Sequence, residues 1–102
     1  MRDNATKYAR TLTLFADSHA QDAAQLAAGL ESNDFTALKK LAHTLKGSAG
    51  MIGATAVSEA AAILDSAIRT SAGQEEIDAA CTVLITQLAS LLESVRGALS
   101  EE

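Results

Sequence analysis

Residues 42–54 read Ala-His-Thr-Leu-Lys-Gly-Ser-Ala-Gly-Met-Ile-Gly-Ala and contain the histidine best placed for chemistry, His43. Lys46 and Gly47 follow it at helical spacing, so both would lie one turn from the imidazole. A neutral imidazole keeps a free lone pair on one ring nitrogen and is a nucleophile near pH 7. With a cation beside it and no side chain at Gly47, this imidazole is suited to carry a phosphoryl group that a second protein can reach.

The helix that contains His43 has two distinct sides. At about 100° per residue, His43, Gly47 and Gly50 share a face that points away from the apolar stripe. The stripe consists of Leu38, Leu41, Ala42, Leu45, Ala49 and Ile52. A glycine inside a helix costs about 1 kcal/mol relative to alanine. We expect the gain that offsets this cost to be clearance for a bulky group or a second protein over the imidazole.

Three lysines, Lys39, Lys40 and Lys46, lie close to His43 in the sequence. Lys39 and Lys46 flank the imidazole and would neutralise a doubly charged phosphoryl group. For the Lys39-Lys40 pair, plain surface solubility and phosphate steering remain equal alternatives. The sequence has no phosphate-cradling glycine loop and no carboxylate pair for Mg²⁺ near His43. It therefore predicts a carrier that uses its partner's active site and not an autonomous kinase, and the chain's status as an enzyme stays open.

Composition narrows the classes of partner and cofactor. The net charge of −5 argues against nucleic acid, whose phosphates require a positive face. One cysteine, Cys81, and two histidines offer no disulfide and no metal framework. There is no hydrophobic signal core and no apolar run long enough to span a bilayer. We expect a cytoplasmic, monomeric domain without direct membrane contact, which could be a piece of a larger protein anchored in the inner membrane.

Proline-free, alanine- and leucine-rich sequence favours helix, and four helical segments are predicted. They cover about residues 4–30, 33–52, 55–72 and 74–99, and the first could bend near Asp17-Ser18. Short connections make sequence neighbours antiparallel neighbours. The predicted fold is therefore all-α, an up-down-up-down antiparallel four-helix bundle in one domain over residues 1–102.

Other chemically capable side chains have simpler interpretations. His19 falls on the apolar stripe of the first segment, where partial burial or capping near a bend is favoured over a ligand role. Cys81 falls on the seam of the last segment and is expected in the core. Acidic residues spread along several helices are expected on solvated faces.

The stretch 42–50, followed by Gly53-Ala54, resembles the signature of histidine-containing phosphotransfer (HPt) domains. Residues 12–15 resemble the first-helix apolar motif of that family. Asn33-Asp34-Phe35 resembles its turn before the active helix, and residues 58–61 resemble the start of its third helix. The resemblance covers nearly the whole chain, although we expect the short helix that many members carry before the bundle to be cut down.

This resemblance implies phosphorylation of His43 and exchange with the aspartyl phosphate of receiver domains. It implies that Lys46 steadies the phosphoryl group, that Gly47 leaves it space and that Ser48 supports it. Mg²⁺ would be bound by the receiver partner, and no cofactor by this domain. Receiver docking in the family uses apolar surface near the histidine, and the helical wheel points Leu14 and Met51 away from the core. We therefore predict Leu14, Met51 and Lys40 as docking residues.

The preferred hypothesis is a phosphorelay intermediate in two-component signal transduction, carrying a phosphoryl group on His43 between receiver aspartates. The parent protein would be a hybrid sensor kinase. One alternative is the acceptor domain of a chemotaxis-type histidine kinase, phosphorylated directly by the ATP-binding domain. Another, from a different class, is a non-catalytic helical interaction module in which His43 is inert.

Overall fold

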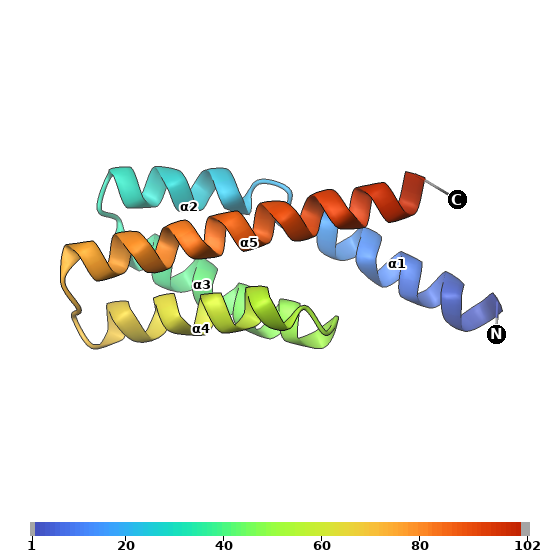
Figure 1. Ribbon diagram of the computed structural model, residues 1–102, viewed down its shortest axis with the longest axis horizontal. Helices are drawn as coiled ribbons and strands as arrows, with labels where there is room; N and C mark the ends of the chain where they lie inside the picture. Colours follow the sequence, from blue (N-terminus) through green and yellow to red (C-terminus); the bar gives the residue numbers. More distant parts are fainter. Residues whose placement is uncertain (1, 101–102) are drawn as a thin grey trace.

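The computed structural model describes the backbone of residues 2–100 and the side chains of residues 9–97. In that part of the chain there are five helices and no strands: α1 (Arg2–His19), α2 (Asp22–Glu31), α3 (Phe35–Met51), α4 (Thr55–Arg69) and α5 (Gln74–Ser100). Helices α2 to α5 run alternately up and down, and α2 closes the ring by packing on α5 (Figure 1). The prediction of an all-α, antiparallel four-helix bundle is confirmed.

The prediction of one first helix over about residues 4–30 is wrong, because a turn at Ala20 and Gln21 interrupts the helix and divides it into α1 and α2. Gln21 precedes α2 without a side-chain capping bond, and the break lies beyond the bend expected at Asp17-Ser18. Helix α1 leaves the bundle at an angle and packs mainly against the end of α5 (Figure 1). A helix of 18 residues, α1, therefore precedes the four helices of the bundle.

The bundle core is built mostly from leucine and alanine. The predicted stripe of α3 is confirmed, since four of its residues are fully buried and two are half-buried. Helix α5 contributes the longest row of buried side chains, and Cys81 lies within it as expected. The other core residues come from every remaining helix: Phe15, Ala16, Leu26, Val57, Ala60, Ala61 and Leu64.

Both ends of α3 are fixed by local chemistry. Asp34 is the N-cap, and its carboxylate accepts a hydrogen bond from the Ala37 amide at 3.1 Å. At the other end, Gly53 has φ +76°, a left-handed conformation that side chains rarely adopt, and it turns the chain into α4. The N-cap of α4 is Ala54, directly before Thr55, the first residue of the helix. The cap at Asp34 and the turn at Gly53 thus define where the helix that carries His43 begins and ends.

Helices α2 and α3 approach each other closely at Gly29. A Cβ atom at this position would lie 3.0 Å from Cδ2 of Leu38. That separation is shorter than packed side chains tolerate without a shift. A side chain at position 29 would therefore require the Leu38 side chain, or the two helices, to shift by a few tenths of an ångström.

Residues Gln74–Gly97 of α5 form the one described helix that is long and apolar enough to cross a membrane by length and composition, with a mean hydropathy of 1.3. Polar residues interrupt α5 throughout, so it contains no continuous apolar run of that length and does not overturn the sequence-based expectation. A core helix of a bundle passes the same test, and five of the larger apolar side chains of α5 pack inward. Ile77, Leu84, Leu88, Leu92 and Val95 are all buried.

Candidate functional site

His43 lies midway along α3 with its side chain exposed, away from the core. Within the described part of the chain, no residue donates a hydrogen bond to it or accepts one from it. It borders a shallow surface depression, called the His43 hollow below. The hollow is lined by His43, Lys46, Gly47, Gly50 and Met51 of α3 and by Ser58 of α4. Both ring nitrogens are therefore available to an incoming group.

The two glycines of the hollow are not required by packing within this chain. A Cβ atom at Gly47 would meet no atom within 4 Å. One at Gly50 would lie 3.6 Å from Oγ of Ser58, which is an ordinary contact. The sequence-based expectation of open space one turn from His43 is thus confirmed. The space faces outward, where only a bound group or another molecule could fill it.

Ser58 connects the two helices that form the hollow. Its hydroxyl donates a hydrogen bond to the backbone carbonyl of Lys46 at 2.9 Å. This bond joins the start of α4 to the last turns of α3 and fixes how the two helices line up. No separate feature of the sequence indicated this contact, because Ser58 was noted only as part of a stretch that resembles the start of a helix.

Lys46 and Lys39 are exposed and lie on the same edge of α3 as His43, one turn to either side of it. That edge faces α4, as the bond between Lys46 and Ser58 shows. Two cations therefore flank the imidazole along the helix, as the sequence predicted. The arrangement supplies positive charge where a phosphoryl group on His43 would lie.

Two predicted site residues lie elsewhere. Ser48 is half-buried and does not line the His43 hollow, because five residues along a helix turn it about 140° away from His43. Lys40 lines a different groove, between α2 and α3, together with Thr44 and His19. The structure therefore brings Lys39, Lys46, Gly47 and Gly50 to His43, but not Ser48 or Lys40.

The exposed apolar side chains include both predicted docking residues. Met51 is 89% exposed and borders the hollow, and Leu14 is 61% exposed on α1. The exposure inferred from the helical wheel is therefore confirmed, while docking itself stays a prediction. The sequence did not indicate Ile63 and Val83, which are also exposed and line an apolar groove between α4 and α5.

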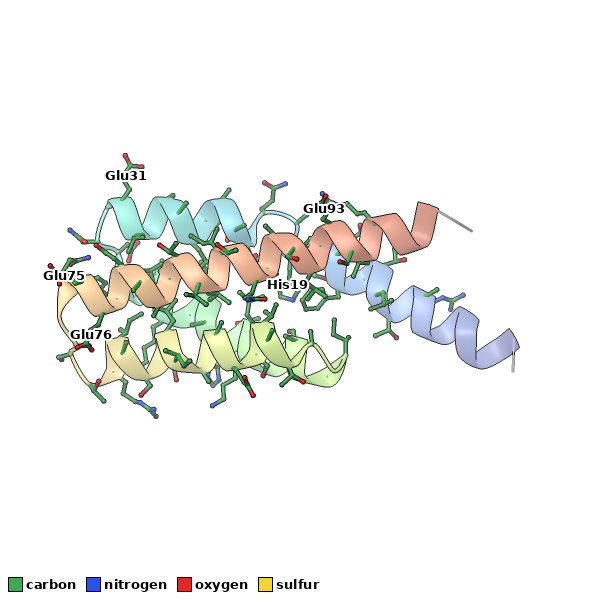
Figure 2. The ribbon with its side chains drawn as sticks, in the orientation of Figure 1. His19, Glu31, Glu75, Glu76 and Glu93 are labelled. Carbon is green, nitrogen blue, oxygen red and sulfur yellow. The ribbon has the colours of Figure 1, made fainter. Side chains whose placement is uncertain are left out.

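Two acidic residues contradict the expectation that all of them lie on solvated faces. Asp22 and Asp65 are each 8% exposed. Asp22 accepts from Nδ1 of His19 at 2.5 Å, and the His19 ring lies 4.5 Å from that of Phe15. Figure 2 shows His19 where α1 meets the bundle, so its predicted burial near a bend is confirmed.

Cys81 and the acidic side chains do not form a metal centre in the described region. No group of three or more histidine, cysteine, aspartate or glutamate side chains lies close enough there to hold an ion. Burial, and secondarily the charge of Asp78, raise the pKa of the Cys81 thiol above its ordinary value. The thiol is thus protonated and inert near neutral pH.

The comparisons with known proteins agree with this geometry. No curated protein and no solved structure matched the chain. A family model described as "Hpt domain" matches residues 10–98, which run from α1 into the last turns of α5 and include the whole His43 hollow. With an exposed histidine on a four-helix bundle and a family match over most of its length, the chain belongs to the Hpt domain family.

Proposed function

We propose that this chain is a phosphorelay intermediate that carries a phosphoryl group on His43 between the aspartates of receiver domains. Its family supports a histidine phosphotransfer role in two-component signalling. The observation that carries the finer proposal is the open space at Gly47, which faces outward beside an exposed and unpaired imidazole. Such a site gives a second protein access to both the nitrogen and the phosphorus.

The transfer itself needs one nucleophilic nitrogen and correct positioning. A neutral His43 nitrogen forms the N–P bond while the O–P bond to the receiver's aspartate breaks. The aspartate leaves as a carboxylate, and the other ring nitrogen of His43 keeps its proton. In the second step, the aspartate of another receiver forms the O–P bond while the N–P bond to His43 breaks. Charge and atoms therefore balance in both directions.

The lysines of the α3 edge contribute electrostatically. Lys46 and Lys39 would offset the negative charge of the phosphoryl group, which in water-exposed surroundings is worth a modest amount for each contact. Ser48 could contribute only if α3 or the partner rearranges, since it points away from the hollow. Gly47 and Gly50 supply clearance, and Met51 and Leu14 supply apolar surface for the receiver.

The partner completes the site. The receiver domain would bring the Mg²⁺ that its own aspartate requires, and this domain would bind no cofactor. We propose a monomeric, cytoplasmic module of a hybrid sensor kinase. The net charge of −5 makes nucleic acid an unfavourable partner.

The direct test is phosphotransfer. Wild-type chain is incubated with a receiver domain that carries labelled aspartyl phosphate, and the label on the chain is tested for acid lability and base stability. We expect label on the wild type and none on His43→Gln. Label on His43→Gln would show that the site is assigned wrongly.

A parallel incubation with a histidine kinase ATP-binding domain separates the two phosphoacceptor hypotheses. Label taken from the receiver but not from the kinase domain supports the relay. Label from the kinase domain alone supports the chemotaxis-type acceptor. No label from either source would leave the non-catalytic interaction module.

A further inference from the structure

Asp65 of α4 is a buried carboxylate without a partner of its own. It is 8% exposed, and within the described residues no hydrogen bond or ion pair reaches it. Charged side chains are rarely this buried unless they are paired. No described side-chain nitrogen or oxygen is both fully buried and unpartnered, so the carboxylate of Asp65 keeps some contact with solvent. The carboxylate therefore reaches the surface of the bundle.

The edge of α4 that carries Asp65 faces α3. Asp65 lies seven residues after Ser58, close to two helical turns, and therefore on the same edge. Ser58 is bonded to the Lys46 carbonyl of α3. The other edge of α4 faces α5, because Ile63 and Ala67 line a groove shared with that helix. Asp65 thus belongs to the same side of the bundle as the His43 hollow.

The register between the helices brings Asp65 level with Lys39. The two helices are antiparallel, so two turns forward from Ser58 on α4 correspond to two turns back from Lys46 on α3. Two turns back from Lys46 is Lys39, on the edge that also carries His43. A lysine ammonium moves on a flexible four-carbon stem, so Lys39 has two anions to choose between once His43 is phosphorylated.

We propose that Asp65 is a positioning residue that competes with the phosphoryl group on His43 for Lys39. This inference rests on the proposed function. In the unphosphorylated chain, the Asp65 carboxylate attracts the Lys39 ammonium along this edge without a close ion pair between them. When His43 carries a phosphoryl group, Lys39 turns to it and leaves Asp65 uncompensated beside a second anion. The repulsion makes the phosphohistidine a better donor, so the carrier passes its phosphoryl group on readily.

The test uses Asp65→Asn, which keeps the shape and removes the charge. Glu93→Gln is the matched control, because Glu93 is exposed on α5 (Figure 2) and its replacement changes the net charge equally. Each chain is mixed with a labelled receiver domain, and the equilibrium distribution of label is measured. We expect Asp65→Asn to hold a several-fold larger share than the wild type, with Glu93→Gln unchanged. Equal shares in all three chains would overturn the inference.

Two further outcomes separate this inference from the proposed function. A wild type that takes up no label from any receiver removes the function and this role together. A wild type that takes up label while Asp65→Asn behaves identically removes only the role of Asp65. If Asp65→Asn does not fold, the wild type is labelled with phosphoramidate and followed by carbon NMR. The Asp65 carboxyl signal must then move on phosphorylation, and a fixed signal overturns the inference.

Discussion

Nδ1 of His19 and the carboxylate of Asp22 are 2.5 Å apart, and together they span the break between α1 and α2. Both residues are buried, so the bond is sheltered from water. It closes the corner at which the chain turns from α1 into the bundle. Loss of either partner would leave the other buried and unsatisfied.

We therefore expect His19→Ala or Asp22→Ala to lower the free energy of unfolding by about 1–3 kcal/mol, the usual cost of an unsatisfied buried polar group. Urea unfolding followed by circular dichroism gives the value. Asp17→Asn, an exposed change on α1, is the control and should stay within about 0.5 kcal/mol of wild type. Variants at His19 and Asp22 that match this control would mean that the pair does not stabilise the corner.

Gly47→Gln should separate stability from transfer. Glutamine is the better helix former by several tenths of a kcal/mol, and the space at Gly47 is empty within this chain, so the bundle should gain stability. The same side chain would fill the clearance beside His43, and we expect phosphotransfer from a receiver to slow about tenfold, or about 1.4 kcal/mol in the barrier. Thermal unfolding and the initial rate of label transfer measure the two effects. Gly47→Ala, with only one added carbon, is the control, and unchanged transfer by Gly47→Gln would refute steric access.

Gly29→Ala and Gly47→Ala should change the stability of the bundle in opposite directions. Alanine favours helix at both positions, but at position 29 its Cβ would lie 3.0 Å from the Leu38 side chain. Overpacking of this kind usually costs about 1–3 kcal/mol. We expect a lower melting temperature for Gly29→Ala and a slightly higher one for Gly47→Ala. A stabilised Gly29→Ala would show that the Leu38 side chain moves aside without cost.

The Cys81 thiol gives a pH-dependent prediction. Burial raises its pKa in the folded chain above the ordinary value of 9.0. Below pH 9 the thiol is protonated in both the folded and unfolded states, and its contribution to stability is fully present. As the pH rises further, the unfolded thiol ionises first, and stability is lost. The urea midpoint should therefore fall more between pH 8 and pH 10 in wild type than in Cys81→Ala, and equal falls would contradict a raised pKa.

Periodicity predicted the α3 side of the site correctly because the leucine-alanine stripe allows only one face of that helix to be buried. The exposure of His43, Lys46 and Gly47 followed from that face alone. The break at Ala20-Gln21 could not be predicted in the same way, because neither residue interrupts a helix. In the structure, the hydrogen bond between His19 and Asp22 spans this break, and the helical pattern of the sequence does not reveal that contact.

The relative positions of side chains on neighbouring helices could not be predicted from the sequence either. A wheel gives the direction of a side chain around its own helix, but not its height relative to a neighbouring helix. The burial of Asp65 depends on the register that Ser58 sets against Lys46. Lys40 was grouped with Lys39 because the two are adjacent, yet adjacent residues are about 100° apart on a helix, and only Lys40 lines the groove between α2 and α3.

The His43 hollow is formed entirely by residues 43–58, one helical hairpin of α3 and α4. Loops this short are closed at little entropic cost, and contacts between near neighbours in the sequence form fastest. We expect the hairpin to take shape early in folding, before α1 and the far end of α5 are docked. The order of assembly would then protect the site, since partial unfolding that begins in α1 leaves His43 and its open flank as they are.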